Sequence, residues 1–298
     1  MFEDFKNAFH RYNNAHVQMI IINVVIFLAM SVIFVVSDLS GASWFGDFIE
    51  RQFAIPSALP ELLVRPWTLV TYMFAHGRLD VMHILFNMLA LYWFGSLFVE
   101  YLGSDKMIAL YVMGGLAGAL IYLVMFNTVP FYIERTHGMS SYMVGASAAI
   151  YAIVVGVATL LPDYTFFMLF LGPVRIKYIA GFYVVLSFLG TTQANAGGNL
   201  AHLGGALMGF VYIKQLQSGN NLGGWVTFII QSVKKLLAPR QNVKVTYRKE
   251  ASSAARKATK GSNISQAEID AILDKISDGG YESLTKEEKD KLFHASKK

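Results

Sequence analysis

The chain has 298 residues, of which 54% are hydrophobic and only 15% are charged, and its mean hydropathy is +0.44. Soluble domains carry about 25% charged residues, so this composition excludes an ordinary water-soluble domain. The net charge of +5 does not indicate a nucleic-acid-binding face, because 16 of the 25 lysines and arginines follow Ile213, and the absence of cysteine excludes disulfides and a thiol nucleophile.

The first predicted element is an apolar run of 20 residues, 17–36, that follows the basic residues Lys6 and Arg11. A bilayer core is crossed by about 20 apolar residues, whereas the apolar part of a signal peptide is shorter. No convincing small-residue cleavage site follows the run. We therefore predict a retained transmembrane helix.

Further apolar segments predict an all-α polytopic membrane protein, with a bundle of six transmembrane helices in residues 1–216. The fourth segment is short, because its 15 residues correspond to about 22 Å of helix against a core of about 30 Å. The run Thr165–Leu171 either extends this span or lies at the membrane interface. The six predicted spans are 17–36, 81–100, 106–126, 147–161, 174–192 and 199–216.

The distribution of basic residues predicts the orientation of the bundle. With six spans, both termini lie on one side of the membrane. The basic tail and the basic residues that flank the spans fall on that same side. Such positive residues favour the cytoplasmic side. The long loop 37–80 is then on the outer side, where His76 and His137 are expected in solvated or interfacial loops. The basic residues concerned are Lys6, Arg11, Lys106, Arg175, Lys177 and Lys214.

Residues 217–298 have a different character from the bundle. Residues 217–262 combine an amphipathic segment, 222–237, expected on the inner leaflet, with a basic linker. Residues 263–298 are predicted to form a small cytosolic helical hairpin, because Ser265-Gln-Ala-Glu268 and Thr285-Lys-Glu-Glu288 have the pattern of capping boxes. No pattern in this hairpin indicates catalysis.

Three predicted spans carry polar side chains, which are rare inside membranes and usually functional. His83 and Asn87 are four residues apart on the second span and therefore share one helix face. Ser147 opens the fourth span, and His202 is near the beginning of the sixth. These three spans all run inward from the outer side. We therefore expect the three groups at similar depths just below the outer surface.

The residue types predict a serine hydrolase centre. A serine hydroxyl is a weak nucleophile that needs a base to accept its proton, and histidine suits that role. We assign Ser147 as the nucleophile and His202 as the general base. Gly205 and Gly209 form a small-residue face that would bring the sixth span close to the fourth. Tyr151, one turn below the serine, would stack on the imidazole.

The start of the fourth span also predicts an oxyanion hole. A helix that begins at Ser147, just after Gly145, presents unpaired backbone N–H groups. The side chains of His83 and Asn87 would add further donors. A helix that starts below the surface leaves irregular backbone at membrane depth, which is tolerated where it lines a water-filled cavity.

This set of motifs resembles the rhomboid intramembrane serine proteases in order, spacing and assignment to spans. The resemblance covers roughly residues 15–216. It implies a Ser147–His202 dyad without an aspartate and a substrate that is itself a transmembrane helix. The motifs are HxxxN (His83, Asn87), GxSx (Gly145, Ser147) and AHxxGxxxG (Ala201, His202, Gly205, Gly209).

Two positions depart from the family pattern. Ala148 follows the nucleophile, where the family usually has glycine. A Trp-Arg pair of many members is replaced by Trp67-Thr68, with Arg65 two residues earlier.

The tail, around ILDKI and GYESLT, resembles cytosolic extensions of rhomboids from Bacteroidota. That resemblance implies a bacterial inner membrane and no activity of the tail, and the basic residues place both termini in the cytoplasm.

Each of these residues also has an ordinary structural interpretation. A lone membrane serine, such as Ser96 or Ser187, usually bonds to its own helix backbone. Asn87 can simply join helices, and the glycines of the sixth span can serve packing alone. The agreement in order and depth favours the catalytic interpretation of Ser147 and His202.

We therefore expect an intramembrane serine endopeptidase that acts through an acyl-enzyme, with membrane proteins and the bilayer as partners and without cofactor, metal or nucleic acid. The sequence contains no HExxH and no paired aspartates inside spans. A catalytically inactive relative that binds membrane helices is the alternative. A transporter or channel would need charged residues deep in several spans and an internal repeat, and the sequence has neither. The oligomeric state stays open.

Overall fold

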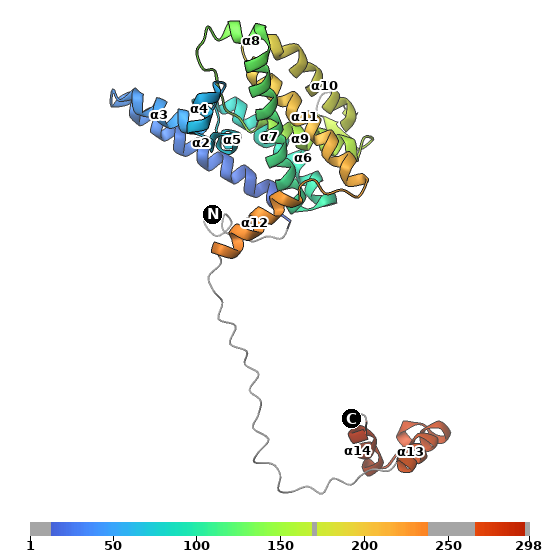
Figure 1. Ribbon diagram of the computed structural model, residues 1–298. Helices are drawn as coiled ribbons and strands as arrows, with labels where there is room; N and C mark the ends of the chain where they lie inside the picture. The colour runs from blue at the N-terminus through green and yellow to red at the C-terminus, as the bar shows by residue number, and fades with distance from the viewer. Residues whose placement is uncertain (1–12, 169–171, 238–265, 296–298) are drawn as a thin grey trace. The chain divides into compact units, whose positions relative to one another are not determined.

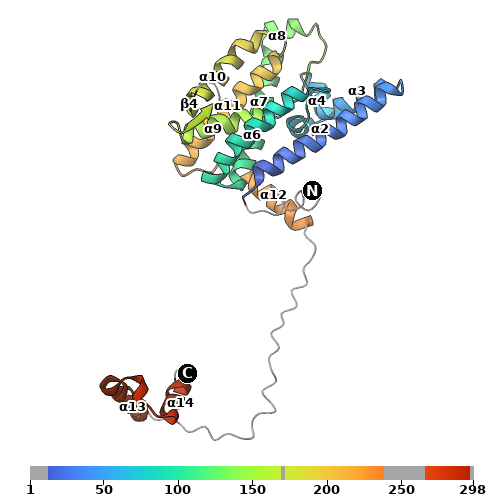
Figure 2. The same ribbon diagram turned by 180° about the vertical axis from the view of Figure 1, so that it is seen from behind.

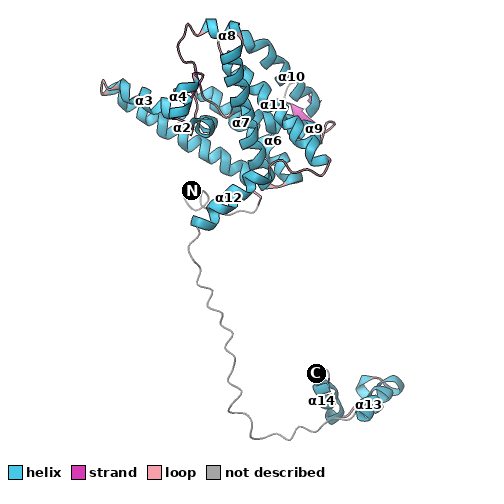
Figure 3. Cartoon of the chain, viewed as in Figure 1, coloured by secondary structure: helices cyan, strands magenta, loops and turns pink. Residues whose placement is uncertain are grey.

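A computed structural model describes residues 13–168, 172–237 and 266–295 (Figure 1). The chain divides into two compact units, Met1–Ala238 and Pro239–Lys298. Helices make up most of the described residues, and the strands are short (Figure 3). The all-α fold class is confirmed.

Each of the six predicted spans coincides with one helix of the first unit. Among the described residues, three helices are long and apolar enough to cross a membrane (α2, α6 and α7), while α9 and α10 are shorter apolar helices. These helices identify an integral membrane protein. The six are α2 (Ala15–Leu39), α6 (Val81–Leu102), α7 (Ser104–Thr128), α9 (Ser147–Leu160), α10 (Ile176–Leu189) and α11 (Ala196–Gln217).

The segment between α2 and α6 contains short helices and a strand, and its C-terminal part is buried within the protein. Tyr72, Met73 and Ala75 are buried in it, and His76 is only 3% exposed. The expectation of a solvated or interfacial His76 is therefore wrong, whereas His137 is exposed. The segment contains α3 (Ser43–Phe53), β1 (Ile55–Pro56), α4 (Leu59–Val64), α5 (Thr68–Thr71) and the 3-10 turn η1 (Tyr72–Phe74).

A β-hairpin connects α9 to α10. Strand β3 (Thr165–Met168) pairs antiparallel with β4 (Gly172–Arg175). The run Thr165–Leu171 therefore does not extend the fourth span, although residues 169–171 lie outside the described part. The fifth span begins at Ile176 and not at 174, because the two preceding residues belong to β4. Aromatic and β-branched residues favour strand geometry here.

Helix α9 is the centre of the bundle and packs against α11, α7, α6 and α10 (Figures 1 and 2). Glycines allow the closest of these contacts. A Cβ added at Gly205 would lie 2.0 Å from the carbonyl oxygen of Ala148, and one added at Gly209 would lie 2.3 Å from that of Ala152. The small-residue face of α11 thus lies directly against the backbone of α9.

Gly205→Ala is expected to lower the free energy of unfolding by about 1–3 kcal/mol, because the added methyl meets main chain that has no rotamer to change. The matched control is Gly181→Ala on α10, where nothing lies within 4 Å of an added Cβ. Denaturant or thermal unfolding in detergent measures both variants. Equal stability of the two would contradict the close approach of α11 to α9.

Two further elements complete the first unit. α8 (Pro130–Arg135) follows α7, and strand β2 (Tyr142–Met143) pairs with β1. α12 (Gly224–Leu237) falls within the segment 222–237 that was expected to be an amphipathic helix, and it packs on α7. Its location on an inner leaflet stays a prediction.

The second unit is the helical hairpin expected from the sequence. It contains α13 (Gln266–Gly279), the turn η3 (Tyr281–Ser283) and α14 (Lys286–Ala295). The side chain of Glu288 accepts the N–H of Thr285 at 2.7 Å, and the N–H of Glu288 donates to the Thr285 hydroxyl at 3.4 Å, so this capping box is formed. The Thr285 N–H and the Lys275 ammonium lower the pKa of Glu288 to about 2. The other predicted box begins at Ser265, outside the described residues.

Candidate active site

Ser147 and His202 meet at the contact of α9 with α11. Ser147 is the first residue of α9, and the imidazole of His202, 8% exposed, points to it across the interface. The His202 Nε2 lies 2.7 Å from the Ser147 Oγ, which is a hydrogen-bond distance. The two residues assigned as nucleophile and base are therefore in contact.

Tyr151 lies flat against the imidazole, as its spacing from Ser147 predicted. The two ring centroids are 4.2 Å apart and the ring planes differ by 12°. The Tyr151 hydroxyl reaches the carbonyl oxygen of Tyr183 on α10 at 3.4 Å. The aromatic ring therefore restricts rotation of His202, and α10 restricts the aromatic ring.

Ser187 is the residue at this site that sequence reasoning missed. Its hydroxyl lies 3.1 Å from the His202 Nδ1 and 2.8 Å from the Tyr151 hydroxyl. The expectation that Ser187 bonds to its own helix is wrong. Ser96 does follow that expectation, because its hydroxyl donates to the Trp93 carbonyl at 3.0 Å. The two serines look alike in sequence, and only the packing of α10 on α11 separates them.

A small cavity opens beside the Ser147 hydroxyl. Its volume is about 160 Å³. Asn87 is 8% exposed, and its side-chain nitrogen Nδ2 has no hydrogen-bond partner. A buried amide N–H group without a partner is costly, and Asn87 lines this cavity, so its amide is a candidate donor to a ligand oxygen. The lining residues are His83, Phe86, Asn87, Ala90, Ser147, Ile150, Tyr151, Val154, Tyr183 and His202.

His83 and Gly145 border the same space. The backbone N–H of His83 donates to the Asp80 side chain at 3.1 Å, which caps the start of α6 and places His83 in its first turn. Gly145 has a φ of +141°, a conformation that side chains disfavour. A Cβ at Gly145 would lie 3.4 Å from the Ser147 Oγ and 3.7 Å from the His83 Nε2. Glycine at this position therefore keeps the space between these groups open.

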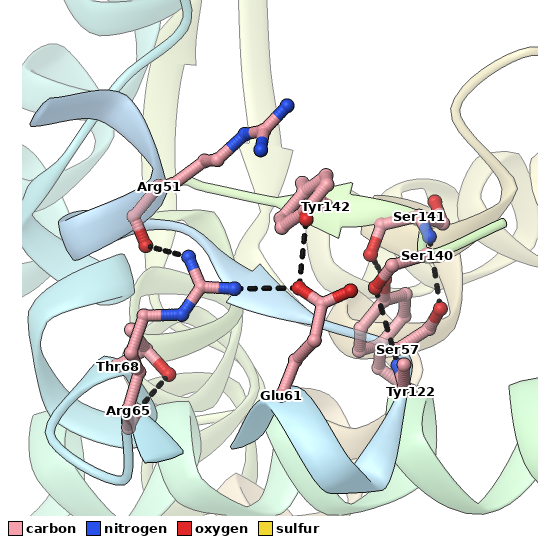
Figure 4. A network of polar contacts seen from close by, with 10 residues as sticks. Arg51, Ser57, Glu61, Arg65, Thr68, Tyr122, Ser140, Ser141 and Tyr142 are labelled. Carbon is pink, nitrogen blue, oxygen red and sulfur yellow. Dashed lines mark hydrogen bonds and ion pairs between the residues drawn. The ribbon is translucent and has the colours of Figure 1, made fainter. Parts of the chain in front are cut away.

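The chain that leads to Gly145 is held by a polar network (Figure 4). Ser57 and Ser141 exchange two hydrogen bonds, at 2.8 and 2.9 Å, beside the β1–β2 pair. The Tyr122 hydroxyl donates to the Ser141 carbonyl at 2.8 Å, and the Tyr142 hydroxyl donates to Glu61 at 2.7 Å. The backbone just before the nucleophile is thus tied to α4 and α7.

The two departures from the family pattern have structural explanations. The Trp67 indole N–H donates to the Gln52 carbonyl at 3.0 Å, and Arg65 bonds both Glu61 and the Arg51 carbonyl, so these residues join α3 to α4 and α5. The second departure, Ala148, is buried.

The methyl group of Ala148 faces Gly118 on α7. A Cβ added at Gly118 would be 2.7 Å from the Cβ of Ala148. The missing side chain on α7 therefore makes room for the methyl group on α9. Within the described ranges, no cluster of three or more histidine, aspartate or glutamate side chains could hold a metal ion.

Two protein families match different parts of the chain. Residues 64–218 match the rhomboid domain family, and residues 260–298 match a family of unknown function (DUF6576). The mitochondrial RHOMBOID-like protein 12 of Arabidopsis thaliana is 32% identical over 164 residues, which are 51% of this chain and 47% of that protein. The mitochondrial presenilin-associated rhomboid-like protein A of Danio rerio is 31% identical over 171 residues, which are 56% of this chain and 41% of that protein.

A similar protein from Mus musculus, the mitochondrial presenilin-associated rhomboid-like protein, is 30% identical over 157 residues, which are 51% of this chain and 38% of that protein. The chain thus spans less than half the length of these curated relatives. The rhomboid match covers more than half of the chain and includes His83, Asn87, Ser147 and His202. The chain belongs to the rhomboid family.

Proposed function

We propose that this protein is an intramembrane serine endopeptidase with Ser147 as nucleophile and His202 as general base. The observation that carries the proposal is the 2.7 Å contact between the Ser147 Oγ and the His202 Nε2 at one wall of a cavity. As Oγ attacks the scissile carbonyl, Nε2 takes its proton. The same imidazole then donates that proton to the leaving amine, and an acyl-enzyme forms.

The negative charge that develops on the carbonyl oxygen needs donors that are already in place. Three residues that line the cavity can supply them: Ser147 with its N–H at the start of α9, Asn87 with an Nδ2 that has no partner, and His83 with its ring. Water then attacks the acyl group, His202 takes a proton from that water, and Ser147 is regenerated.

An apolar groove next to the active-site cavity supports a transmembrane helix as the substrate. The groove has a volume of about 420 Å³, and it shares Phe86, Ala90 and Tyr183 with the cavity. Its remaining lining comes from α6, α10 and the β-hairpin and is hydrophobic. An apolar segment is thus suited to lie beside Ser147. For the orientation, the basic residues near the ends of the spans favour cytoplasmic termini, and the resemblance of the tail to rhomboids from Bacteroidota favours a bacterial inner membrane.

Labelling with a fluorophosphonate, which reacts with activated serines, tests the proposal. The wild-type protein in detergent is expected to be labelled at Ser147, and Ser147→Ala is expected to lose the label and all cleavage of membrane substrates. Ser96→Ala, a membrane serine bonded to its own helix, is the control and should be labelled normally. Cleavage is followed by comparing fragments of membrane proteins in cells that express wild-type protein or Ser147→Ala. An unlabelled wild-type protein without Ser147-dependent fragments would favour an inactive helix-binding relative.

A further inference from the structure

The Nδ1 nitrogen of His202, which faces away from Ser147, has a partner on a third helix. Ser187 of α10 is 2% exposed, and its Oγ lies 3.1 Å from Nδ1. In Ser-His-Asp enzymes a carboxylate occupies this position. Within the described residues, no carboxylate is bonded to the His202 ring, and its two nitrogens contact the hydroxyls of Ser147 and Ser187.

The contacts beyond Ser187 favour one direction for the hydrogen bonds. The Tyr151 hydroxyl is 3.4 Å from the carbonyl oxygen of Tyr183, and a carbonyl oxygen only accepts. Tyr151 therefore donates to Tyr183, which leaves its oxygen to accept from Ser187 at 2.8 Å. Ser187 then donates its single O–H to Tyr151, and its oxygen accepts a hydrogen bond from the Nδ1–H of His202.

This direction selects one tautomer of the imidazole. A neutral imidazole carries one proton, and the hydrogen bond at one nitrogen sets which nitrogen has it. With the hydrogen on Nδ1 directed to Ser187, Nε2 keeps its lone pair and faces the Ser147 hydroxyl at 2.7 Å. That is the form a general base requires.

We propose that Ser187 is a positioning residue for His202. Three hydrogen bonds follow one another: the His202 Nδ1–H donates to Ser187, Ser187 donates to Tyr151, and Tyr151 donates to the Tyr183 carbonyl. The two hydroxyls thereby take the role that a carboxylate has in a catalytic triad. They hold the tautomer and the ring orientation, and Ser187 continues to accept a hydrogen bond when the ring becomes charged. The inference rests on the proposed function, because it assigns a helper to the proposed base.

Three variants at position 187 separate the hydrogen bond from packing. Ser187→Ala is expected to lower kcat by about 10–100-fold with little change in KM, which is the effect of losing a hydrogen bond to a group that becomes charged in the transition state. Ser187→Cys has nearly the size of serine, but its sulfur accepts poorly, so it should behave like Ser187→Ala. Ser187→Thr keeps the hydroxyl and should recover most of kcat. Ser96→Ala is the matched control with unchanged kinetics.

Nitrogen-15 NMR of histidine-labelled protein gives a readout that a structural role would not change. The His202 signal, identified by its loss in His202→Ala, should show the hydrogen on Nδ1 in the wild-type protein and a mixture of tautomers in Ser187→Ala. The positioning role would be overturned by a wild-type hydrogen on Nε2, by unchanged kcat in Ser187→Ala, or by full activity of Ser187→Cys. In each of these cases, fluorophosphonate labelling of Ser147 in the wild-type protein would still support the proposed protease function. A wild-type protein without Ser147 labelling would overturn the proposed function itself.

Discussion

His202→Ala is expected to lower the turnover of a helical membrane substrate by about 10⁴-fold or more, the loss seen when a serine hydrolase loses its base. In the wild-type protein, Nε2 is the group placed to accept the Ser147 proton, at 2.7 Å. Without it, the hydroxyl stays protonated at neutral pH and attacks a carbonyl slowly. The same variant should also lose fluorophosphonate labelling, because that reaction needs the same proton transfer.

The control for this experiment is a histidine outside the site. His137 is exposed and has a φ of +49°, so His137→Asn suits its backbone and should retain full activity. Turnover is measured with purified protein and a single-span substrate in liposomes. If His202→Ala kept more than about a tenth of wild-type turnover, and that turnover still required Ser147, another group would have to serve as the base.

Asn87→Ala is expected to lower turnover by about 10²–10³-fold, the usual cost of removing one oxyanion donor. Its Nδ2 has no partner in the resting protein, so its hydrogen bond is available to the oxyanion of the transition state. For the same reason, the substitution removes no existing bond of this nitrogen, and the free energy of unfolding should change little.

Asn23→Ala is the matched comparison, because Asn23 is the asparagine that joins helices. Asn23 is fully buried, and its Nδ2 donates to the Met19 carbonyl at 2.8 Å and to the Tyr111 hydroxyl at 3.3 Å. This variant should lose about 0.6–1.7 kcal/mol of stability, as for hydrogen bonds between membrane helices, and keep its turnover per folded molecule. Steady-state kinetics and denaturant unfolding measure both effects. The reverse pattern would make Asn87 a structural residue.

The positions of the helices in the first unit could be predicted from sequence because a bilayer imposes a length and a polarity on every crossing segment. Polar side chains inside such segments are few, so His83, Ser147 and His202 could be selected and compared in depth. The same reasoning failed for His76, which was expected to be solvated or interfacial because it lies in the loop between the first two spans. In the fold that segment turns inward, and its burial depends on contacts with distant helices.

Ser187 illustrates a second limit. A serine within an apolar helix usually bonds to the preceding turn, and Ser96 does so. Whether the hydroxyl leaves its own helix depends on the rotation of α10 relative to α11, which no local pattern encodes. The hairpin after α9 was missed for a related reason, since a short apolar run is compatible with strand or helix until its partner strand is known.

The contact between Ala148 and Gly118 shows how a departure from a family motif should be interpreted. The methyl group of Ala148 occupies space that the glycine at position 118 on α7 leaves vacant. Close packing therefore limits the summed volume of these two residues, which belong to different helices. A variant with glycine at position 148 and alanine at position 118 would have the same summed volume but would still be strained. Its Cβ at position 118 would lie 2.8 Å from the carbonyl oxygen of Ala201. The helix that carries His202 therefore limits the size of the residue at position 118, and the glycine there leaves room for the alanine after the nucleophile.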